Sequence, residues 1–418
     1  MRNRNNRIST LKCPVHSLSR VAIWMLVAVC PWISLSPAQG AIIDPSRMID
    51  WSQAGIPGGI PNRTTVCATI NATTYGNGTT DATTAIQNAL NSCPANQVVY
   101  LPAGTYRING SLRVPSNVTL RGAGPKQTIL DARGSGSAVV SLGQSVSPSA
   151  ANSVAITGGT TAGSNTIAVS SASGITVGSY LMITELNDPS FVTIEGNQGT
   201  CTWCDASMWK ATRVLGQIVE VTSINGTNIG ISPSLYITYS SSLSPLAAKF
   251  AAGGKYAGVE DLQVYANNTG YTANLRMDGA AYCWIKNIES NYADGDHVQA
   301  FNSYRGEIRD SYFHDAFSHT SGTTDADVFI AIKSSGFLVE NNALRRLHCS
   351  VLLNWGAAGN VIAHNYMDGN FDTTAPNVLI YELSAHGAHP MFNLWGRQHP
   401  RFPASGWHLG IFQPQYCV

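Results

Sequence analysis

Charged side chains are scarce in this sequence. They make up only 12% of its 418 residues, and 25 Lys and Arg nearly balance 24 Asp and Glu. A chain with so little net charge has no basic field to hold a nucleic acid and no acidic field to attract cations broadly. Long helical stretches rich in Leu, Glu and Lys are also missing, whereas Gly, Thr, Ser and Asn are abundant. This composition is typical of many short strands joined by turns.

The only strongly apolar run lies near the beginning of the sequence. Basic residues between Arg2 and Arg20 precede the run 21–35, and Ala38-Gln39-Gly40 offers small residues for cleavage. The run is short and interrupted by a proline, which is unfavourable for spanning a bilayer. We therefore expect residues 1–40 to be a signal peptide, with a membrane anchor as the alternative, and the mature chain to be extracellular or periplasmic.

Seven of the nine cysteines follow this predicted signal. In an oxidising compartment they can form disulfides. We expect one disulfide between Cys67 and Cys93, which bracket a predicted helix, and a local one between Cys201 and Cys204. The second pair also resembles half of a redox or zinc site, but a second CxxC or a matching His pair is missing.

Residues 41–144 combine a helix signal with strand signals. Apolar residues spaced as on one helix face begin at Ala82, and Asp81 or Thr80 can cap that helix. The strand-like runs that follow, separated by Pro-containing turns, are 98–101, 104–108 and 118–120. A helix at the end of stacked short strands would cover the apolar edge of the first turn, which keeps a solenoid soluble.

The stretch 145–250 has a different texture. It is rich in Ser, Thr and Gly, contains alternating apolar pieces, and carries Asn225-Gly226, which is typical of a two-residue hairpin turn. We interpret it as an inserted antiparallel β-module, in which 188–210 is a long loop.

From about residue 256 a repeat appears. Five aligned pieces carry a polar residue at positions 261, 287, 310, 341 and 364, so the steps are 26, 23, 31 and 23. A coil of this length with occasional loop insertions predicts a right-handed parallel β-helix, in which each turn gives three short strands. The alternative is a β-sandwich, whose strands would recur without the longer period. We predict an all-β solenoid with coils over 251–395.

The tail 396–418 changes abruptly to Arg, His, Pro and Trp without strand alternation. An unfinished stack would expose its last rung. We therefore expect this tail to be aberrant or truncated and the natural protein to have further coils, which sequencing of the locus would check.

Three stretches carry a family resemblance: NGTTDATTAIQNAL from Asn77, VVYLPAGTY from Val98 and NVTLRGAG from Asn117. They resemble the N-terminal part of the pectate-lyase-like superfamily, in the branch shared by rhamnogalacturonases, polygalacturonase relatives and alginate epimerases. The resemblance covers residues 66–130 well and 256–395 loosely. It implies a β-helix that handles polysaccharide but not a reaction, because this fold carries lyases, hydrolases, epimerases, tailspikes and adhesins.

The polygalacturonase pattern of three spaced Asp residues, Gly-His-Gly and Arg-Ile-Lys is incomplete here. Asp294-Gly295-Asp296-His297 and Ile332-Lys333 match only parts of it, and no Gly-His-Gly follows. This departure puts a hydrolase assignment by resemblance in doubt.

The repeat places acidic and basic residues in columns. If Ile285 and the apolar residues at the same position of later coils are equivalent, Asn291 aligns with His314, Arg345 and Asp368. Further columns join Asp294 to His348 and Asp296 to His319. Asp327 follows Asp296 by 31 residues. Stacked neighbours lie about 4.8 Å apart and can cooperate. The predicted catalytic set is Asp294, Asp296, His297, His314, Asp327, Arg345 and His348. Lys333 and Trp355 are candidates for substrate binding. The alternative is a polar ladder that only satisfies backbone groups.

Two reactions fit such a set. β-Elimination from a uronate needs a neutralised carboxylate, a base and an acid, and hydrolysis needs two carboxylates, one of them protonated. Lyases on this fold often use calcium, so calcium is a candidate cofactor. We predict a secreted, monomeric polysaccharide lyase or glycoside hydrolase for an acidic polysaccharide such as pectin. The alternatives are a non-catalytic glycan-binding or adhesin-like surface protein and an inactive fragment.

Overall fold

A computed structural model describes residues 44–190, 212–320, 327–374, 380–387, 389–396 and 399–400. The chain divides into two compact units, 1–44 and 45–418, and the architecture below belongs to the second. The predicted signal peptide, Cys201, Cys204 and most of the tail lie outside the described residues. Within the described ranges no helix is long and apolar enough to cross a membrane.

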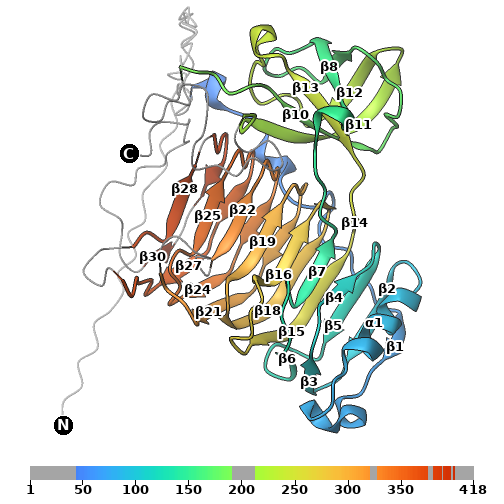
Figure 1. Cartoon of the computed structure of the whole chain (residues 1–418), viewed down its shortest axis with the longest axis vertical. Helices are drawn as coiled ribbons and strands as arrows, with labels where there is room; N and C mark the ends of the chain where they lie inside the picture. The colour runs from blue at the N-terminus through green and yellow to red at the C-terminus, as the bar shows by residue number, and fades with distance from the viewer. Residues whose placement is uncertain are drawn as a thin grey trace, which may run out of the picture. The chain divides into compact units, whose positions relative to one another are not determined.

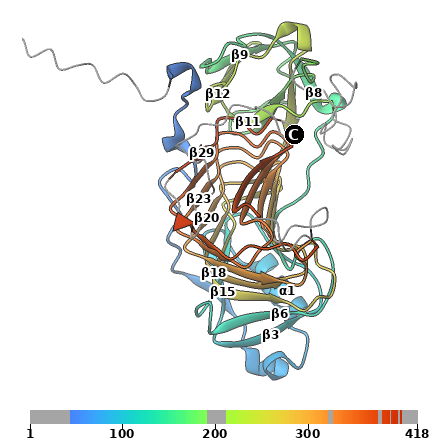
Figure 2. The same cartoon turned by 90° about the vertical axis from the view of Figure 1, so that its left-hand side faces the viewer.

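Short parallel strands stacked coil upon coil form a β-helix (Figure 1). Successive coils contribute to a 15-stranded sheet and to a seven-stranded sheet, and strands such as β3, β6, β15 and β18 lie one on another in Figure 2. The predicted all-β solenoid is therefore confirmed.

The 15-stranded sheet has two arms, because the long strands β15 and β18 bend and pair in both. The first arm contains β1 (Val66–Thr69), β2 (Gln97–Leu101), β5 (Val118–Gly122), β15 (Gly258–Ala266), β18 (Trp284–Ala293), β20 (Glu307–Arg309), β23 (Leu338–Glu340), β26 (Val361–Ala363) and β29 (Leu394–Trp395). The second arm adds β3 (Gly104–Ile108), β6 (Thr128–Ala132), β21 (Tyr312–Ala316), β24 (Ala343–Arg345), β27 (Tyr366–Asp368) and β30 (His399–Pro400).

The seven-stranded sheet forms another side of each coil. Its strands are β4 (Leu112–Val114), β7 (Val140–Gly143), β16 (Ala273–Asp278), β19 (Asp296–Phe301), β22 (Val328–Ala331), β25 (Val351–Asn354) and β28 (Leu383–His386). One face of these strands supplies buried apolar side chains such as Leu275, Val298 and Val328 to the core shared with the 15-stranded sheet. The alternating side chains point the other way.

The predicted repeat register is confirmed in the first arm. Ile285 pairs with Ile308, Ile308 with Val339, and Val339 with Ile362. All four are buried in the common core.

The polar repeat position marks the bend between the two arms. Asp261, Asn287, Asp310, Asn341 and His364 all have positive φ angles, between 50° and 57°. Asn and Asp tolerate this left-handed conformation better than most residues, because their short side chains form local hydrogen bonds. Their side chains also bond between neighbouring coils, because Asn287 donates to Asp261 at 2.6 Å and Asn341 donates to Asp310 at 2.8 Å. The bend therefore explains the period that the sequence shows.

Helix α1 (Thr83–Ser92) covers the N-terminal end of the stack, with Ile86 and Leu90 in the core. The N-cap residue is Ala82 rather than the predicted Asp81 or Thr80, and Asp81 accepts a hydrogen bond from the backbone N–H of Thr83 at 3.0 Å. Short 3-10 helices lie at η1 (Pro45–Arg47), η2 (Trp51–Gln53), η3 (Ala72–Gly78), η4 (Ala150–Asn152) and η6 (Ser241–Leu243).

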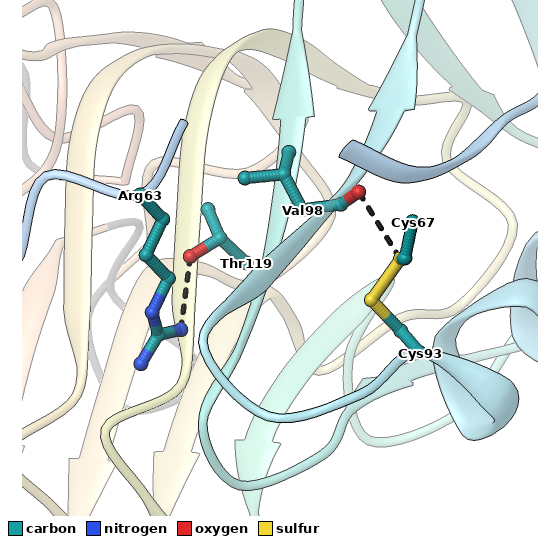
Figure 3. The surroundings of a disulfide bond; sticks show 5 residues. All are labelled: Arg63, Cys67, Cys93, Val98 and Thr119. Atoms are coloured by element: carbon teal, nitrogen blue, oxygen red, sulfur yellow. Dashed lines mark hydrogen bonds between the residues drawn. A yellow bond between two sulfur atoms is a disulfide. The ribbon is translucent and has the colours of Figure 1, made fainter. Parts of the chain in front are cut away.

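The predicted disulfide between Cys67 and Cys93 is present (Figure 3). It joins β1, the first strand of the stack, to the residue that follows α1, and the Cys67 Sγ lies 3.1 Å from the carbonyl oxygen of Val98 on β2. The disulfide therefore fixes the capping helix to the first strands.

Between β7 and β15 the chain forms a separate closed antiparallel barrel. Its strands are β8 (Ser153–Gly158), β9 (Thr166–Val169), β10 (Tyr180–Thr184), β11 (Gly216–Asn225), β12 (Asn228–Ser232) and β13 (Leu246–Phe250). Asn225 pairs with Asn228, so the hairpin turn is Gly226-Thr227, one residue later than predicted. The barrel has its own apolar core and contacts the stack, where Tyr304 donates a hydrogen bond to the carbonyl of Ser232 at 3.0 Å. Between barrel and stack, β14 (Gly254–Lys255) pairs with β17 (Ala280–Ala281).

A segment before the first strand runs along the stack. Trp51 donates to the carbonyl of Phe392 at 2.7 Å, and the backbone N–H of Ile56 donates to Glu307 at 2.8 Å. Arg63 then donates to Thr119 at 3.0 Å (Figure 3). This strap, residues 51–63, therefore links late coils to early ones.

Candidate functional site

Asp294 holds a loop in place. One of its carboxylate oxygens accepts hydrogen bonds from the backbone N–H groups of Thr269, Gly270 and Tyr271, at 2.8, 2.7 and 3.0 Å. A carboxylate that satisfies three backbone donors is typical of a structural residue. The geometry supports a loop-positioning role for Asp294.

Asp296, His297 and Asp327 lie close together at the start of β19 and β22. Val298 pairs with Val328, and the N–H of His297 donates to the carbonyl of Asp327 at 3.0 Å. The step here is therefore 30 residues rather than the predicted 31, so Asp327 lies beside His297 and the predicted pairing of Asp296 with His319 is wrong. Parallel pairing sets this register because both valines must face the core.

His297 is fully buried and hydrogen-bonded on both ring nitrogens. Nδ1 lies 2.7 Å from the Ser290 hydroxyl and Nε2 lies 3.1 Å from the carbonyl oxygen of Asp315. Burial, helped by His314, lowers the pKa of His297 to about 3. The side chain is therefore neutral near pH 7 and out of reach of a polymer.

His314 and Arg345 occupy a different surface. Asn291, His314, Arg345 and Asp368 pair in sequence, which confirms this predicted column, and they lie on the second arm of the 15-stranded sheet. His348 lies in the connection between β24 and β25, where its Nε2 contacts Asp372 at 3.1 Å. The seven predicted residues are therefore distributed over several places rather than one face.

The two predicted substrate-binding residues also differ in position. Lys333 is fully buried, and a Cβ added at Gly216 of the barrel would lie 2.8 Å from the Lys333 side chain. Trp355 follows β25 and is partly exposed, with its ring 5.9 Å from that of Phe329. Only Trp355 is placed where a polysaccharide can touch it.

The outward side chains of the seven-stranded sheet form the best candidate site. Arg276, Gln299, Phe329 and Leu352 pair in sequence on β16, β19, β22 and β25 (Figure 1). Asp278 and Phe301 pair two residues further on. We call this surface, with Trp355 beside it, the seven-strand face.

One half of the seven-strand face is a polar network. Arg276 forms an ion pair with Asp278 at 2.7 Å and donates to the Gln299 side-chain oxygen at 3.0 Å. Gln299 in turn donates to Asp296 at 2.6 Å. The network thus joins two nearly buried carboxylates through a guanidinium whose side chain stays 18% exposed.

Burial sets the protonation of Asp278. Removal from water raises the pKa of the Asp278 carboxyl above its ordinary value, although the ion pair with Arg276 lowers it. A buried carboxyl with a raised pKa has the properties of a general acid.

The other half of the seven-strand face is an aromatic row. The rings of Phe301 and Phe329 lie 5.3 Å apart, edge to face, and the Trp355 ring continues the row. Arg276 lies over the Phe301 ring at 5.1 Å, so the network and the row are continuous. All three aromatic side chains are partly exposed. A row of rings beside a cation suits a sugar polymer that carries carboxylates.

The described part of the chain contains no preformed calcium site. There, no three His, Cys, Asp or Glu residues are grouped so that they could hold a metal ion. The predicted calcium ion therefore has no assigned ligands among the described residues.

Sequence reasoning missed Arg276, Asp278, Gln299, Phe301 and Phe329. The signal that could have found them is the alternation in LRMD and VQAF, in which every second residue is apolar and small or aliphatic. In a buried-core strand the intervening residues must face outward.

Comparison with known proteins supports the resemblance. Residues 69–171 match the family model described as "Rhamnogalacturonase A/epimerase, pectate lyase-like". This segment is similar to that family. It comprises the first coils and the start of the barrel, so the superfamily resemblance is confirmed there. No curated protein matches the sequence.

One solved structure, a tailspike, supports the β-helix fold. The tailspike protein gp49 from Pseudomonas phage LKA1 is 16% identical with a TM-score of 0.55, over 79% of this chain and 54% of that chain. An exopolygalacturonase from Thermotoga maritima is 9% identical with a TM-score of 0.39, over 84% and 68%. The chain thus spans about half the length of the tailspike that it matches.

Proposed function

We propose that this protein is a secreted enzyme that cleaves an acidic polysaccharide bound along the seven-strand face. The observation that carries the proposal is the network Asp278–Arg276–Gln299–Asp296 beside an aromatic row. The rings would stack on sugar residues, and the guanidinium would bind a uronate carboxylate, which its planar donors match well.

The two carboxylates favour hydrolysis over β-elimination. Asp278, whose pKa is raised, would protonate the glycosidic oxygen as it leaves. Asp296, held by Gln299, would act as the ionised carboxylate. β-Elimination would instead use Arg276 to neutralise the uronate carboxylate. It also needs a base that removes a proton from the sugar ring, and no residue of the network is assigned to that role.

A binding protein without catalysis is the second candidate. The observation in its favour is the burial of Asp278 and Asp296, which are 6% and 2% exposed and both engaged by neighbouring side chains. Such carboxylates could serve only to hold Arg276 in place for binding.

A polysaccharide panel that includes pectin and alginate tests the proposal. We expect new reducing ends without the absorbance of an unsaturated uronate, which would identify a hydrolase. Unsaturated product would identify a lyase and contradict the roles given to the two carboxylates. Binding without either product would leave the second candidate.

Variants then locate the activity. Asp278→Asn should reduce turnover about 100-fold or more, because a general acid typically contributes that much. Asp310→Asn is a matched control, because asparagine stands at the same bend position in neighbouring coils. If Asp278→Asn keeps full activity while it is folded, the site lies elsewhere.

Export is part of the proposal. The predicted signal peptide supports it, and the Cys67–Cys93 disulfide suits an oxidising compartment. Detection of the mature chain outside the cytoplasm, cleaved near Gly40, is the expected result, and an uncleaved cytoplasmic chain would contradict it.

A further inference from the structure

Two tyrosines frame a notch on the second arm of the 15-stranded sheet. Tyr312, Ala343 and Tyr366 occupy the same position on the consecutive strands β21, β24 and β27. The small Ala343 between two rings leaves a gap about two strand spacings wide, or roughly 10 Å. We call Tyr312, Ala343 and Tyr366 the tyrosine notch. Figure 1 shows the three strands one after another in the stack.

An open pocket of about 570 Å³ adjoins the notch at Ala343 and Tyr366, and Tyr312 lies outside its lining. This volume falls within the range of about 300–1,000 Å³ that is usual for small-molecule sites. The residues that line it are Arg309, Glu340, Asn341, Asn342, Ala343, His364 and Tyr366.

One wall of the notch is held rigidly. The Tyr312 ring stacks on the His314 ring, with centroids 4.0 Å apart. His314 is itself fixed by Asp315 at 2.7 Å and by Glu289 at 3.2 Å. The opposite wall, Tyr366, is 41% exposed, so its ring is accessible to a ligand.

Two pairs of oppositely charged side chains lie near the notch. Arg309 contacts Glu340 at 3.0 Å, and Arg345 contacts Asp368 at 3.3 Å, on either side of Ala343. Each pair presents donors and acceptors next to a ring, which is the pattern that neighbouring sugar hydroxyls need. Arg309 also contacts Asp310 at 3.1 Å and Glu307 at 3.8 Å, so carboxylates outnumber the two guanidinium groups and the notch disfavours an acidic ligand.

We propose that the tyrosine notch is a second saccharide-binding site, which takes a neutral, hydroxyl-rich sugar chain. It lies on a different sheet from the seven-strand face and differs from it in charge. A polymer with both acidic and neutral parts would then be held at two places on the stack. The proposal goes beyond the cleavage proposed above and does not require it.

Titration with neutral trisaccharides tests the site. Cellotriose, xylotriose, maltotriose and a β-1,4-galactotriose are added to the full chain, and binding is measured by saturation-transfer NMR and calorimetry. We expect saturable binding of at least one of them. Tyr366→Ala should weaken that binding tenfold or more, because one of the two stacking walls is lost.

Two matched variants complete the test. Tyr381→Ala removes a tyrosine that is 63% exposed and does not line the cavity, and it should leave binding unchanged. Arg276→Gln alters the seven-strand face and should also leave it unchanged. No saturable binding by any of the four sugars, or binding that Tyr366→Ala leaves intact, overturns the proposal. Loss of binding in Arg276→Gln alone would place the sugar on the seven-strand face and would also overturn it.

Discussion

Asp294 and Asp278 are carboxylates on neighbouring coils, but their surroundings give them different tasks. Asp294 accepts three backbone hydrogen bonds from one loop, whereas Asp278 shares a guanidinium with Gln299 on the outer face of a sheet. In the first arrangement, one oxygen of Asp294 is fully occupied by hydrogen bonds that hold the loop. The second keeps a cation near the surface, where a substrate carboxylate can reach it.

Replacement of Asp294 tests its assignment as a structural residue. Asp294→Ala should lower the free energy of unfolding by about 1–3 kcal/mol, because three backbone donors lose their acceptor. Turnover per folded molecule should stay at the wild-type value. Urea unfolding together with an activity assay measures both, and a stable but inactive variant would return Asp294 to the catalytic set.

The buried His297 should make the protein sensitive to acid. Its folded pKa of about 3 lies below the ordinary value of 6.5, so the unfolded state binds more protons between these two pH values. The free energy of unfolding must therefore fall as the pH falls from about 6.5 towards 3. For this group the loss is on the order of 1 kcal/mol per pH unit. His297→Gln should show a shallower loss in urea unfolding between pH 6 and pH 4. Equal slopes in both proteins would show that His297 is not held neutral.

Single residues also show where sequence reasoning ends. The column of His314 and Arg345 could be predicted because the repeat in the first arm has a visible polar marker. The register of Asp327 could not be predicted, because the connection before β22 differs in length from those of other coils. Only the pairing of Val298 with Val328 fixes this register. Arg276 lies outside the repeat that marks the first arm, and only the alternation in LRMD indicates that it faces outward.

At the scale of elements, the capping helix depends on its attachment. Helix α1 is only ten residues long, too short to be stable in water on its own. Packing of Ile86 and Leu90 and the disulfide that follows the helix hold it on the stack. The helix could be predicted from spacing and its disulfide from the cysteines that bracket it, whereas strand β1 was not among the predicted strands.

Loss of the disulfide should destabilise this end of the stack. The bond closes a loop of 26 residues, for which chain entropy gives about 3 kcal/mol. Cys67→Ser with Cys93→Ser should lower the free energy of unfolding by roughly that amount, and hydrogen exchange should increase first in α1. Unchanged exchange in α1 would mean that packing alone holds the helix.

At the scale of the whole stack, two surfaces of different chemistry lie on different sheets. The seven-strand face carries a guanidinium and aromatic rings, and the tyrosine notch carries rings beside ion pairs in which carboxylates outnumber cations. The strap 51–63 connects coils that are far apart in sequence. The period and the resemblance predicted the solenoid, whereas the path of the strap left no periodic signal.

A crystal structure of the Asp278→Asn variant with an acidic oligosaccharide from the panel tests the central claim most directly. The account predicts sugar rings along Phe301, Phe329 and Trp355, with a uronate carboxylate bound to Arg276. An acidic chain seated on any other surface, with the seven-strand face empty, would contradict it.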